Sequence, residues 1–555
     1  MQKSRIFLKG EQDTKVSCLQ WIMRKEYLVS AKEMQKYDKN TIKTIGIPSV
    51  VLMERAAFAV AMEALDMLAL NTDKRDMTVD SIVADKVQPR VLIVAGNGNN
   101  GADGVCAGRI LKEYGIECDV CLLKKELPYV EELHRQLSIA EYYQMEKIQP
   151  EDINFPKYDL IIDAIFGVGL NREIAGTAKE IIGMINESQI PVLSVDIPSG
   201  IDATSGAILG CAIKASHTVT FGFYKRGQFF YPGKIYCGML KKAKIAINET
   251  TFFDEEPGMF MYRNYQDKVE CLMRDPMGNK GTFGKVFVIA GRASTTGAAV
   301  LCASSALRSG CGMVAVLTEK ENKAVFLQTL PEIMVETYVS DEVTQNLHAK
   351  IQKWMDWSDV IVMGCGLLQD EIAYDMLVYV LAHTNKTVVL DADALQLIAK
   401  NLPLQDLVRE CSIRLKAKEQ ALVFTPHPGE LASLLKCSIS QVKENRFGVV
   451  EKVLERYPVI LIAKDADTLV CGKDEKWYLN TTGNDGLSTA GSGDVLAGLT
   501  ASMLAQNRKK KISSFESVCQ SVYLHGMAAD YLTQQNGKSF LVASDLIEAY
   551  KYVLK

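Results

Sequence analysis

Short apolar runs alternate with helix-like segments along most of the chain. Apolar runs bounded by polar or glycine-rich residues are typical of strands that are buried on both faces of a parallel sheet. In the first half of the chain we expect such strands at 90–95, 159–163, 191–195 and 218–221. In the second half we expect them at 285–290, 313–317, 360–363, 387–390, 422–424 and 459–463. The sequence therefore predicts an α/β protein in which one parallel-sheet domain follows another.

The alternation breaks off between residues 248 and 280, and we place the junction of the two domains there. A chain of 555 residues is also too long for a single core, because domains usually hold about 100–200 residues. Within the first domain, the polar stretch at 71–89 is expected to be a surface loop. The predicted organisation is an N-terminal extension at 1–27, a first domain at 28–247, a linker and domain entry at 248–280, and a second domain at 281–555.

Composition excludes several classes of protein. The formal net charge of -4 gives no basis for binding nucleic acid, which requires a basic surface. No run reaches the roughly 18 apolar residues of a membrane span, and the first residues lack the apolar core of a signal peptide. The 14 cysteines are scattered, and Cys118 and Cys121 would lie on opposite faces of a strand. We therefore expect a cytoplasmic protein with reduced thiols that binds neither nucleic acid nor a membrane.

A glycine-rich segment at 96–104 separates the first expected strand from a helix expected at 105–114. Such a turn leaves backbone N–H groups at the start of a helix free to bind phosphate. The segment formally contains GxGxxG, so an ordinary dinucleotide site with Asp119 as the ribose-binding acid stays open. Oxygen-bearing side chains crowd the same segment and favour a hydrated cation beside the phosphate. These side chains are Asn99, Asn100 and Asp103.

Two further strands of the first half end at acidic residues. Asp163 is followed by a glycine-containing segment at 164–172, and Asp196 is followed closely by Ser199. Because ligands bind at the carboxyl ends of the strands in an open parallel sheet, we expect Asn100, Asp163, Asp196 and Ser199 to converge in one crevice. The alternative is that each strand-terminal carboxylate caps the following helix. Capping accounts for single positions better than for the whole set.

These segments resemble the NAD(P)H-hydrate epimerase family. The resemblance rests on 52–56, 96–104, 163–170, 195–202 and a tail at 215–233 that includes Lys225, and it covers about 28–247. It implies a Rossmann-like domain that interconverts the R and S hydrates at C6 of reduced nicotinamide. It also implies a potassium ion held by Asn100, Asp163 and Ser199. The hydrate of NADH or NADPH would contact Asn99, Asn100, Gly101, Ala102, Asp103, Gly167, Val168, Gly169, Leu170, Asn171, Arg172, Glu173 and Asp196.

Two details of this resemblance bear on chemistry. Ala102 stands where the family usually has glycine, which is acceptable if the backbone there does not need a positive φ. Asp196 is a candidate catalytic residue, since a carboxylate can assist proton transfer. The spacing of the motifs does not decide which residue acts as the base.

The strongest local signal of the second half is the glycine-rich segment at 484–498, which leads into a helix. Gly491 and Gly493 allow backbone amides to approach phosphate oxygens at the start of the helix. Asp494, in the first turn, is placed to accept a proton from a substrate hydroxyl during phosphoryl transfer. The alternative is a capped helix after a flexible loop, which explains a single glycine or aspartate but not the whole run.

This segment resembles the GxGD element of ribokinase-like kinases. Together with 290–301, 306–314, 364–366, 390–395 and 424–430 it is similar to NAD(P)H-hydrate dehydratase, from about residue 281 to the end. The resemblance implies a ribokinase-like domain in which Asp494 is catalytic. The hydrate would contact Ala298, Gly366, His427 and Asp494. The adenine nucleotide would contact Lys464, Asp465, Ala466, Asp467, Thr468 and Gly493.

Four positions of this second resemblance have two interpretations. The family usually has Lys-Gly where this chain has Lys464 and Asp465, and a carboxylate near a phosphate is unfavourable unless it points away or holds a metal. A lone histidine such as His427 is more often structural than functional, although its motif favours a site. Asp391 and Asp393 either orient a metal or water, or simply end a strand.

The implied chemistry is coherent. Hydroxide is a poor leaving group, so phosphorylating the C6 hydroxyl and then eliminating phosphate restores the reduced nicotinamide. Magnesium would neutralise charge on the transferring phosphoryl group. The fusion of both domains resembles ADP-dependent enzymes, which convert ADP to AMP and phosphate, and ATP dependence is the alternative. The family resemblance also implies a homo-oligomer whose partners are the small molecules NADHX, NADPHX and ADP. A ribokinase-like vitamin-precursor or sugar kinase with a non-catalytic N-terminal binding domain is the rival hypothesis.

Overall fold

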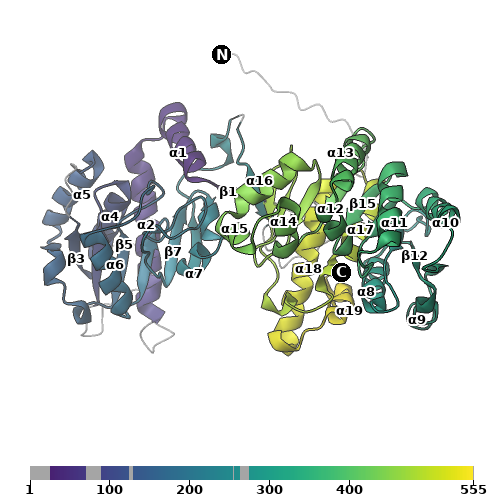
Figure 1. Ribbon diagram of the computed structural model, residues 1–555. Coiled ribbons are helices and arrows are strands. Elements are labelled where there is room, and N and C mark those ends of the chain that lie inside the picture. Colours follow the sequence, from purple (N-terminus) through teal and green to yellow (C-terminus); the bar gives the residue numbers. More distant parts are fainter. Residues whose placement is uncertain (1–24, 71–88, 124–128, 254, 263–273, 554–555) are drawn as a thin grey trace, which may run out of the picture. The chain divides into compact units, whose positions relative to one another are not determined.

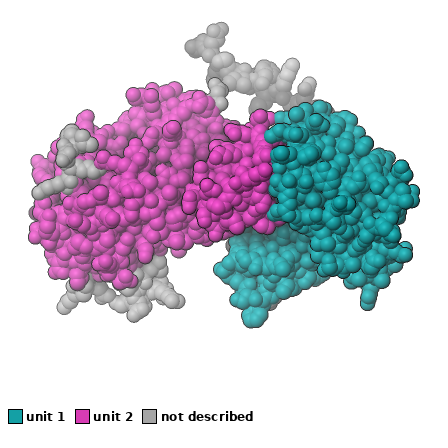
Figure 2. All heavy atoms as spheres, viewed as in Figure 1, with its two compact units in different colours: residues 1–25, 262–425, 482–555 teal, residues 26–261, 426–481 magenta. Residues whose placement is uncertain are grey.

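The computed structural model describes residues 25–70, 89–123, 129–253, 255–262 and 274–553 (Figure 1). The predicted extension up to residue 24 and the predicted loop at 71–88 lie outside this range. The chain forms two compact units, coloured separately in Figure 2. Unit 2 contains residues 26–261 and 426–481, and unit 1 contains the remaining residues. Among the described residues, no helix is both long and apolar enough to span a bilayer.

Unit 2 contains a seven-stranded parallel sheet, which confirms the predicted strands of the first half. The strand order is β4-β3-β2-β5-β6-β7-β9. Strands are therefore added in one direction from β2 to β4 and in the opposite direction from β5 onward, which makes the boundary between β2 and β5 a topological switch point. In such a sheet the crevice for a ligand opens at the carboxyl ends of the strands on either side of this switch point. The strands are β2 (Arg90–Ala95), β3 (Glu117–Leu122), β4 (Glu146–Ile148), β5 (Leu160–Ala164), β6 (Val192–Val195), β7 (His217–Phe221) and β9 (Met239–Ala243).

Helices cover both faces of this sheet (Figure 1). Strand β2 shows why, since Val91 and Ile93 pack with α2, α4 and α5, whereas Leu92 and Val94 pack with α6. Successive side chains of a strand point to opposite faces, so an unbroken apolar run needs a helix layer on each side. The helices before and around the sheet are α1 (Ala31–Asn40), continued by a π-helix (Thr41–Ile45), α2 (Ser49–Leu70), α4 (Asn99–Glu113), α5 (Glu131–Tyr142), α6 (Thr177–Glu187) and α7 (Gly233–Tyr236).

Helix α4 begins at Asn99, six residues before the predicted start at 105, so that prediction was wrong. Much of the glycine-rich segment is helical because its small residues permit close packing. A Cβ added at Gly101 would lie 2.0 Å from the carbonyl oxygen of Gly96, and one at Gly104 would lie 2.4 Å from Cβ of Ala164. Ala102 lies inside the helix, where its φ is not positive, so an alanine is acceptable at this position in place of glycine.

Unit 2 also contains six strands in the order β17-β18-β19-β10-β1-β8. The region predicted as a linker at 248–280 therefore includes a strand, β10, whose Met259 pairs with Trp477. Strand β1 likewise begins at Lys25, within the predicted extension at 1–27. The strands are β1 (Lys25–Val29), β8 (Tyr224–Lys225), β10 (Met259–Tyr262), β17 (Ile460–Ala463), β18 (Leu469–Cys471) and β19 (Trp477–Leu479). The accompanying helices are α14 (Pro428–Leu435), α15 (Ile439–Glu444) and α16 (Arg446–Arg456).

Unit 1 is built on a parallel sheet in the order β13-β12-β11-β14-β15-β16. Five of its strands were predicted from the sequence, whereas β13 was not, and the strand predicted at 459–463 is β17 of unit 2, which pairs antiparallel with β18. Helix α17 is buried from Val495 to Asn507 and packs against α8, so it is the central helix of this unit. The strands are β11 (Lys285–Ile289), β12 (Met313–Glu319), β13 (Met334–Tyr338), β14 (Val360–Met363), β15 (Thr387–Leu390) and β16 (Leu422–Phe424). The helices are α8 (Thr296–Arg308), α9 (Lys323–Thr329), α10 (Thr344–Trp357), α11 (Glu371–His383), α12 (Asp393–Lys400), α13 (Leu402–Lys416), α17 (Ser492–Lys509), α18 (Ser514–Asn536) and α19 (Ala543–Val553).

Candidate active sites

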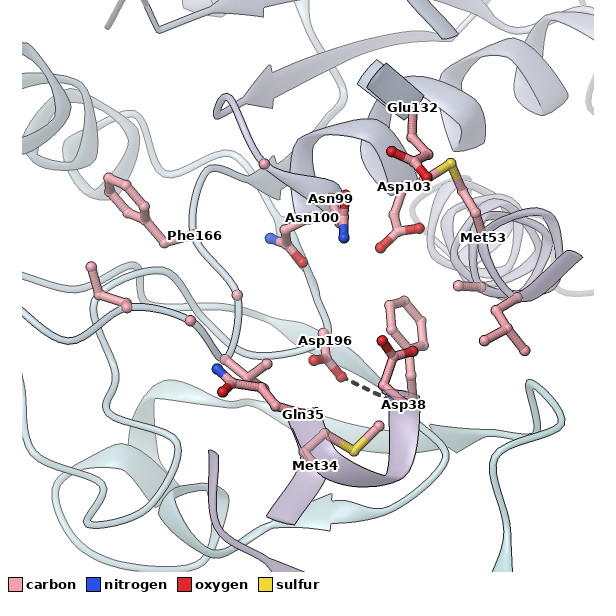
Figure 3. A pocket seen from close by; sticks show the side chains of 18 of the residues that line it. Met34, Gln35, Asp38, Met53, Asn99, Asn100, Asp103, Glu132, Phe166 and Asp196 are labelled. Atoms are coloured by element: carbon pink, nitrogen blue, oxygen red, sulfur yellow. Dashed lines mark hydrogen bonds between the residues drawn. The ribbon is translucent and has the colours of Figure 1, made fainter. Parts of the chain in front are cut away.

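A cavity of about 650 Å³ opens in unit 2 at the carboxyl ends of β2, β5 and β6. Most of the residues predicted to contact the hydrate line it, namely Asn99, Asn100, Asp103, Gly167, Val168, Gly169, Leu170, Asn171, Arg172 and Asp196. Gly101 and Ala102 are instead buried in the first turns of α4, and Glu173 lies beyond the lining segment. Figure 3 shows three carboxylates that point into this cavity from separate elements, those of Asp38, Asp103 and Asp196.

Asp196 is held at the cavity by a buried lysine. The Lys225 ammonium, whose side chain is 0% exposed, donates to the Asp196 carboxylate, to the Thr220 hydroxyl at 2.9 Å and to the Phe221 carbonyl at 3.1 Å. The backbone N–H of Phe221 also donates to Asp196, at 2.9 Å. Burial lowers the pKa of Lys225, and the neighbouring Asp196 charge opposes that shift.

The backbone of Asp196 is itself unusual. Its φ is +66°, a left-handed conformation that residues other than glycine seldom adopt. Its carbonyl oxygen accepts a hydrogen bond from the Gln228 side chain at 2.8 Å, which holds the turn from the other side. Strained backbone of this kind persists only where the surroundings enforce it, and it is common at functional sites.

Unlike Asp196, neither Asp103 nor Asp38 forms an ion pair with a basic side chain among the described residues. Burial raises the pKa of Asp103 well above its ordinary value, and the charges of Asp196 and Asp38 add to the effect. Burial and the Asp196 charge likewise raise the pKa of Asp38. The cavity therefore combines one carboxylate beside an ammonium group with two carboxyl groups that favour the protonated form. A fourth carboxyl group, that of Glu132, also lines the cavity and accepts a hydrogen bond from the Ser49 hydroxyl at 3.1 Å. Sequence reasoning missed Asp38, because it belongs to the amphipathic helix α1 and to no recognisable motif.

Asp163 and Ser199 lie beneath the cavity floor and are fully buried. Asp163 accepts hydrogen bonds from the Ser199 hydroxyl at 2.5 Å, the Ser199 N–H at 2.9 Å and the Ser194 hydroxyl at 2.8 Å. Burial nevertheless raises its pKa. Ser199 also accepts from the Phe166 N–H at 2.9 Å, and the next residue, Gly167, packs against the Asn100 side chain.

These contacts bear on the predicted potassium site. The buried Asn100 amide nitrogen has no hydrogen-bond partner, so its side chain is not committed to the protein. The amide oxygen, the hydroxyl and the carboxylate of Asn100, Ser199 and Asp163 are hard oxygen donors gathered around the 165–167 segment. Such donors suit an alkali cation, and the residue types fit the ion.

Asp119 does not serve as a ribose-binding acid, so the ordinary dinucleotide alternative is wrong. Its buried carboxylate accepts from the Arg90 guanidinium at 2.8 and 2.9 Å and from the Tyr158 hydroxyl at 2.8 Å. It is also absent from the cavity lining. A carboxylate with these three charged or polar contacts stabilises the sheet rather than a ligand.

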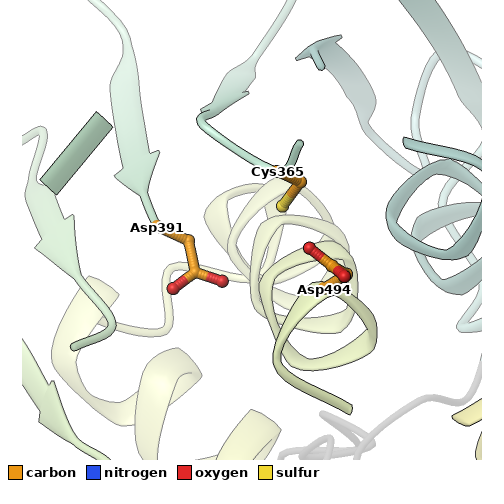
Figure 4. Close-up of side chains that lie close together, drawn as sticks. All are labelled: Cys365, Asp391 and Asp494. Carbon is orange, nitrogen blue, oxygen red and sulfur yellow. The ribbon is translucent and has the colours of Figure 1, made fainter. Parts of the chain in front are cut away.

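A second cluster lies in unit 1, where Cys365, Asp391 and Asp494 come together (Figure 4). The sulfur and carboxylate oxygens all lie within 4.8 Å of one another. Cys365 and Asp391 follow the ends of β14 and β15, and Asp494 is in the first turn of α17. A hydrogen bond with Cys302, burial and the nearby carboxylates raise the pKa of Cys365 well above its ordinary value, which leaves it a neutral thiol. The two carboxylates are the hard donors that magnesium prefers, so this pair fits the predicted ion.

Residues beside this cluster include two of the predicted hydrate contacts. Gly366 has a φ of +60°, and an added Cβ there would lie 2.9 Å from the Thr295 carbonyl and 3.0 Å from Cβ of Ala298. Gly366 and Ala298 are therefore packed together next to Cys365. Gly493 precedes Asp494 in the first turn of α17, after the left-handed Gly491. Asp393 is a structural residue, since it accepts from the Leu368 N–H at 2.8 Å and the Gln369 side chain at 3.0 Å.

The other predicted residues of the second site lie in unit 2. Residues 464–468 form the turn between β17 and β18, in which Asp465 accepts from the Ala466 N–H at 2.8 Å and lies 4.0 Å from Arg446. His427 caps α14, because its Nδ1 accepts from the Gly429 N–H at 3.0 Å. This is the structural role expected of a lone histidine, but the side chain remains 57% exposed, so its outer edge is accessible to a ligand.

Comparison with known proteins assigns both halves of the chain. The family described as YjeF-related protein N-terminus matches residues 49–227, and the family described as NAD(P)H-hydrate dehydratase matches residues 286–551. The bifunctional NAD(P)H-hydrate repair enzyme Nnr of Moorella thermoacetica is 31% identical over 95% of this chain and 97% of its own length. The enzyme of the same name from Escherichia coli is 32% identical over 83% of this chain and 84% of its own length.

A solved structure of the ADP/ATP-dependent NAD(P)H-hydrate dehydratase from Bacillus subtilis covers 51% of this chain and 92% of its own, at 26% identity and a TM-score of 0.43. The matches over nearly the whole length agree with the predicted fold class, a Rossmann-like domain followed by a ribokinase-like α/β domain. They also favour the repair hypothesis over a small-molecule kinase with a silent N-terminal domain. The chain therefore belongs to the family of bifunctional NAD(P)H-hydrate repair enzymes.

Proposed function

We propose that residues 28–247 epimerise R- and S-NAD(P)HX at C6 and that residues 281–555 dehydrate the S form, converting ADP to AMP and phosphate. The observation that carries the proposal is the cavity at the switch point of the seven-stranded sheet, with Asp38, Asp103 and Asp196 facing one space. Inversion of C6 by opening and closing the ring needs a proton acceptor at the C6 hydroxyl and a proton donor at N1. A non-catalytic binding domain has no need of such a set.

In the epimerase cavity, Asp196 beside Lys225 acts as the base and Asp103 as the acid. Asp196 removes the proton of the C6 hydroxyl while Asp103 protonates N1, and the C6–N1 bond breaks to leave an aldehyde. Rotation about the C5–C6 bond and closure of N1 on the opposite face give the other epimer, and both protons return. Asn100, Asp163 and Ser199 would hold potassium, and its charge would offset that of the substrate pyrophosphate.

In the dehydratase, Asp494 accepts the proton of the C6 hydroxyl as that oxygen receives the β-phosphoryl group of ADP and AMP leaves. The C6–O bond then breaks to release phosphate, and C5 loses a proton to the departing phosphate, which restores the C5=C6 double bond. Gly366, Ala298 and His427 bind the hydrate, while residues 464–468 and Gly493 bind the nucleotide. Asp391, whose carboxylate lies within 4.8 Å of that of Asp494, would hold magnesium, and the ion would offset the negative charge of the phosphoryl group. ATP in place of ADP is the alternative.

The test is recovery of reduced-nicotinamide absorbance from a mixed R/S hydrate with magnesium, potassium and ADP, repeated with ATP. Full recovery with ADP establishes both activities. Recovery that stops at the S fraction means that the epimerase half is silent, and no recovery with either nucleotide refutes the proposal.

We also propose that the protein is a cytoplasmic homo-oligomer whose partners are small molecules only. The proposal rests on the family resemblance. Sedimentation velocity of the purified chain measures the oligomeric state, and a monomer at micromolar concentration contradicts it.

A further inference from the structure

The turn at 464–468 is packed against the epimerase half of the chain. Asp467 in this turn forms an ion pair with Lys234, which precedes it by 233 residues, with Nζ and Oδ1 at 2.9 Å. The backbone of Tyr231 also hydrogen-bonds to Asp467. All of these residues belong to unit 2, so the contact lies within one compact body.

Aromatic packing holds the same two segments together. The Phe230 ring meets the Phe447 ring edge-on, with centroids 4.7 Å apart, and Phe447 stacks on Trp477 at 5.8 Å. Phe447 lies in the first turn of α16 and Trp477 begins β19, whereas Phe230 belongs to the epimerase half. Lys234 is therefore placed on a supported surface and not on a freely moving loop.

The position of Lys234 matters because the turn at 464–468 carries buried negative charge. Asp467 is only 4% exposed, and a carboxylate withdrawn from water is unstable without a cation beside it. Burial raises its pKa, while Lys234 and, more weakly, Arg446 oppose that shift. The other carboxylate of the turn, Asp465, faces Arg446 at 4.0 Å. Each acidic side chain of the turn thus has a cationic neighbour, but only that of Asp467 comes from the epimerase half.

We propose that Lys234, a residue of the epimerase half, positions the nucleotide-binding turn of the dehydratase by neutralising Asp467. This inference rests on the proposed function, in which 464–468 binds the nucleotide. An Asp467 without its ammonium partner repels the anionic nucleotide and draws the turn toward solvent. The epimerase half therefore contributes to the affinity of the dehydratase for its nucleotide, although it does not contact the C6 hydroxyl of the substrate.

The experiment measures steady-state dehydration of pure S-hydrate by the full chain, with ADP or ATP varied, for Lys234→Ala. We expect the KM for the nucleotide to rise roughly tenfold, as for loss of a hydrogen bond between charged groups. The kcat, the KM for the hydrate and the epimerisation rate without nucleotide should stay unchanged. Lys214→Ala, which removes an exposed lysine of the same half, is the matched control and should behave as the wild type.

Two further variants separate positioning from simple structural damage. Lys234→Arg should keep the nucleotide KM within about threefold of wild type, because the cation is retained. Lys234→Ala combined with Asp467→Asn should recover most of the affinity, because the unpaired charge is gone. An unchanged nucleotide KM in an active Lys234→Ala enzyme overturns the inference, as does an equal loss of every activity. A wild-type chain that dehydrates with neither nucleotide refutes the proposed function instead.

Discussion

Replacing Lys225 by methionine tests the charge arrangement of the epimerase cavity most directly. Methionine fills much of the volume of the lysine stem, so the change removes the ammonium group without opening a large void. It deletes three donated hydrogen bonds, to Asp196, Thr220 and Phe221. It leaves a carboxylate that is 7% exposed with no cation against it.

The structure sets the size of the effect. Removing one partner of a buried ion pair lowers the free energy of unfolding by about 3–5 kcal/mol. Asp196 borders the cavity and keeps the hydrogen bond from the Phe221 N–H, so we expect the lower end, about 3 kcal/mol. Lys225→Met combined with Asp196→Asn should recover about half of the loss, because the uncompensated charge is removed.

Two assays measure the effect. Urea unfolding, monitored by a spectroscopic signal from the epimerase half, gives the free energy of unfolding, and the hydrate-repair assay gives the epimerase activity. In the single variant, recovery of absorbance from mixed hydrate should stop at the S fraction, because the dehydratase half is untouched. If the free energy of unfolding of the single variant lies within about 1 kcal/mol of wild type and the variant still epimerises, the assignment of Lys225 as the ion-pair partner of Asp196 is refuted.

Three further outcomes are expected. Asp494→Asn should lower the dehydration kcat on the order of 10²–10⁴-fold, as for loss of a general base, while hydrate epimerisation monitored by chromatography continues. The raised pKa of Asp103 means that its protonated form favours folding, so this contribution is complete at acid pH and is lost as pH rises through the raised pKa. Asp103→Asn should therefore flatten the fall of the thermal midpoint between pH 5 and 9, and a profile identical to wild type would contradict a protonated Asp103. Gly366→Ala should lower stability by about 1–3 kcal/mol and weaken hydrate binding, because the new Cβ meets the Thr295 carbonyl in a left-handed backbone; calorimetry and the hydrate KM measure both.

The local pattern of residues was sufficient to predict the central strands of both sheets, although not the strands β4, β9 and β13. Runs such as Arg90–Ala95 and Val360–Met363 form strands where expected, because a strand covered on both faces must be apolar at every position. The chemistry-bearing residues at strand ends were equally predictable, since parallel strands bring their carboxyl ends to one edge. Asp196 and Asp494 needed no tertiary information to be singled out.

Boundaries and partners were decided only by tertiary packing. Asn99 starts a helix inside a segment that reads as a loop, because contact with Ala164 and Gly96 favours small residues there. The sequence allows Asp119 to bind a ligand, but in the fold its carboxylate accepts hydrogen bonds from Arg90 and Tyr158.

The sequence by itself therefore determined the fold class, the family and most residues that could carry the chemistry, because these depend on periodicity and on short motifs. Only the tertiary structure showed which charges face one another. Asp38 enters the epimerase cavity from α1, and Lys234 reaches Asp467 from another part of the chain. Ionisation and affinity depend on distances across the fold and on burial, and neither quantity is written in the order of residues along the chain.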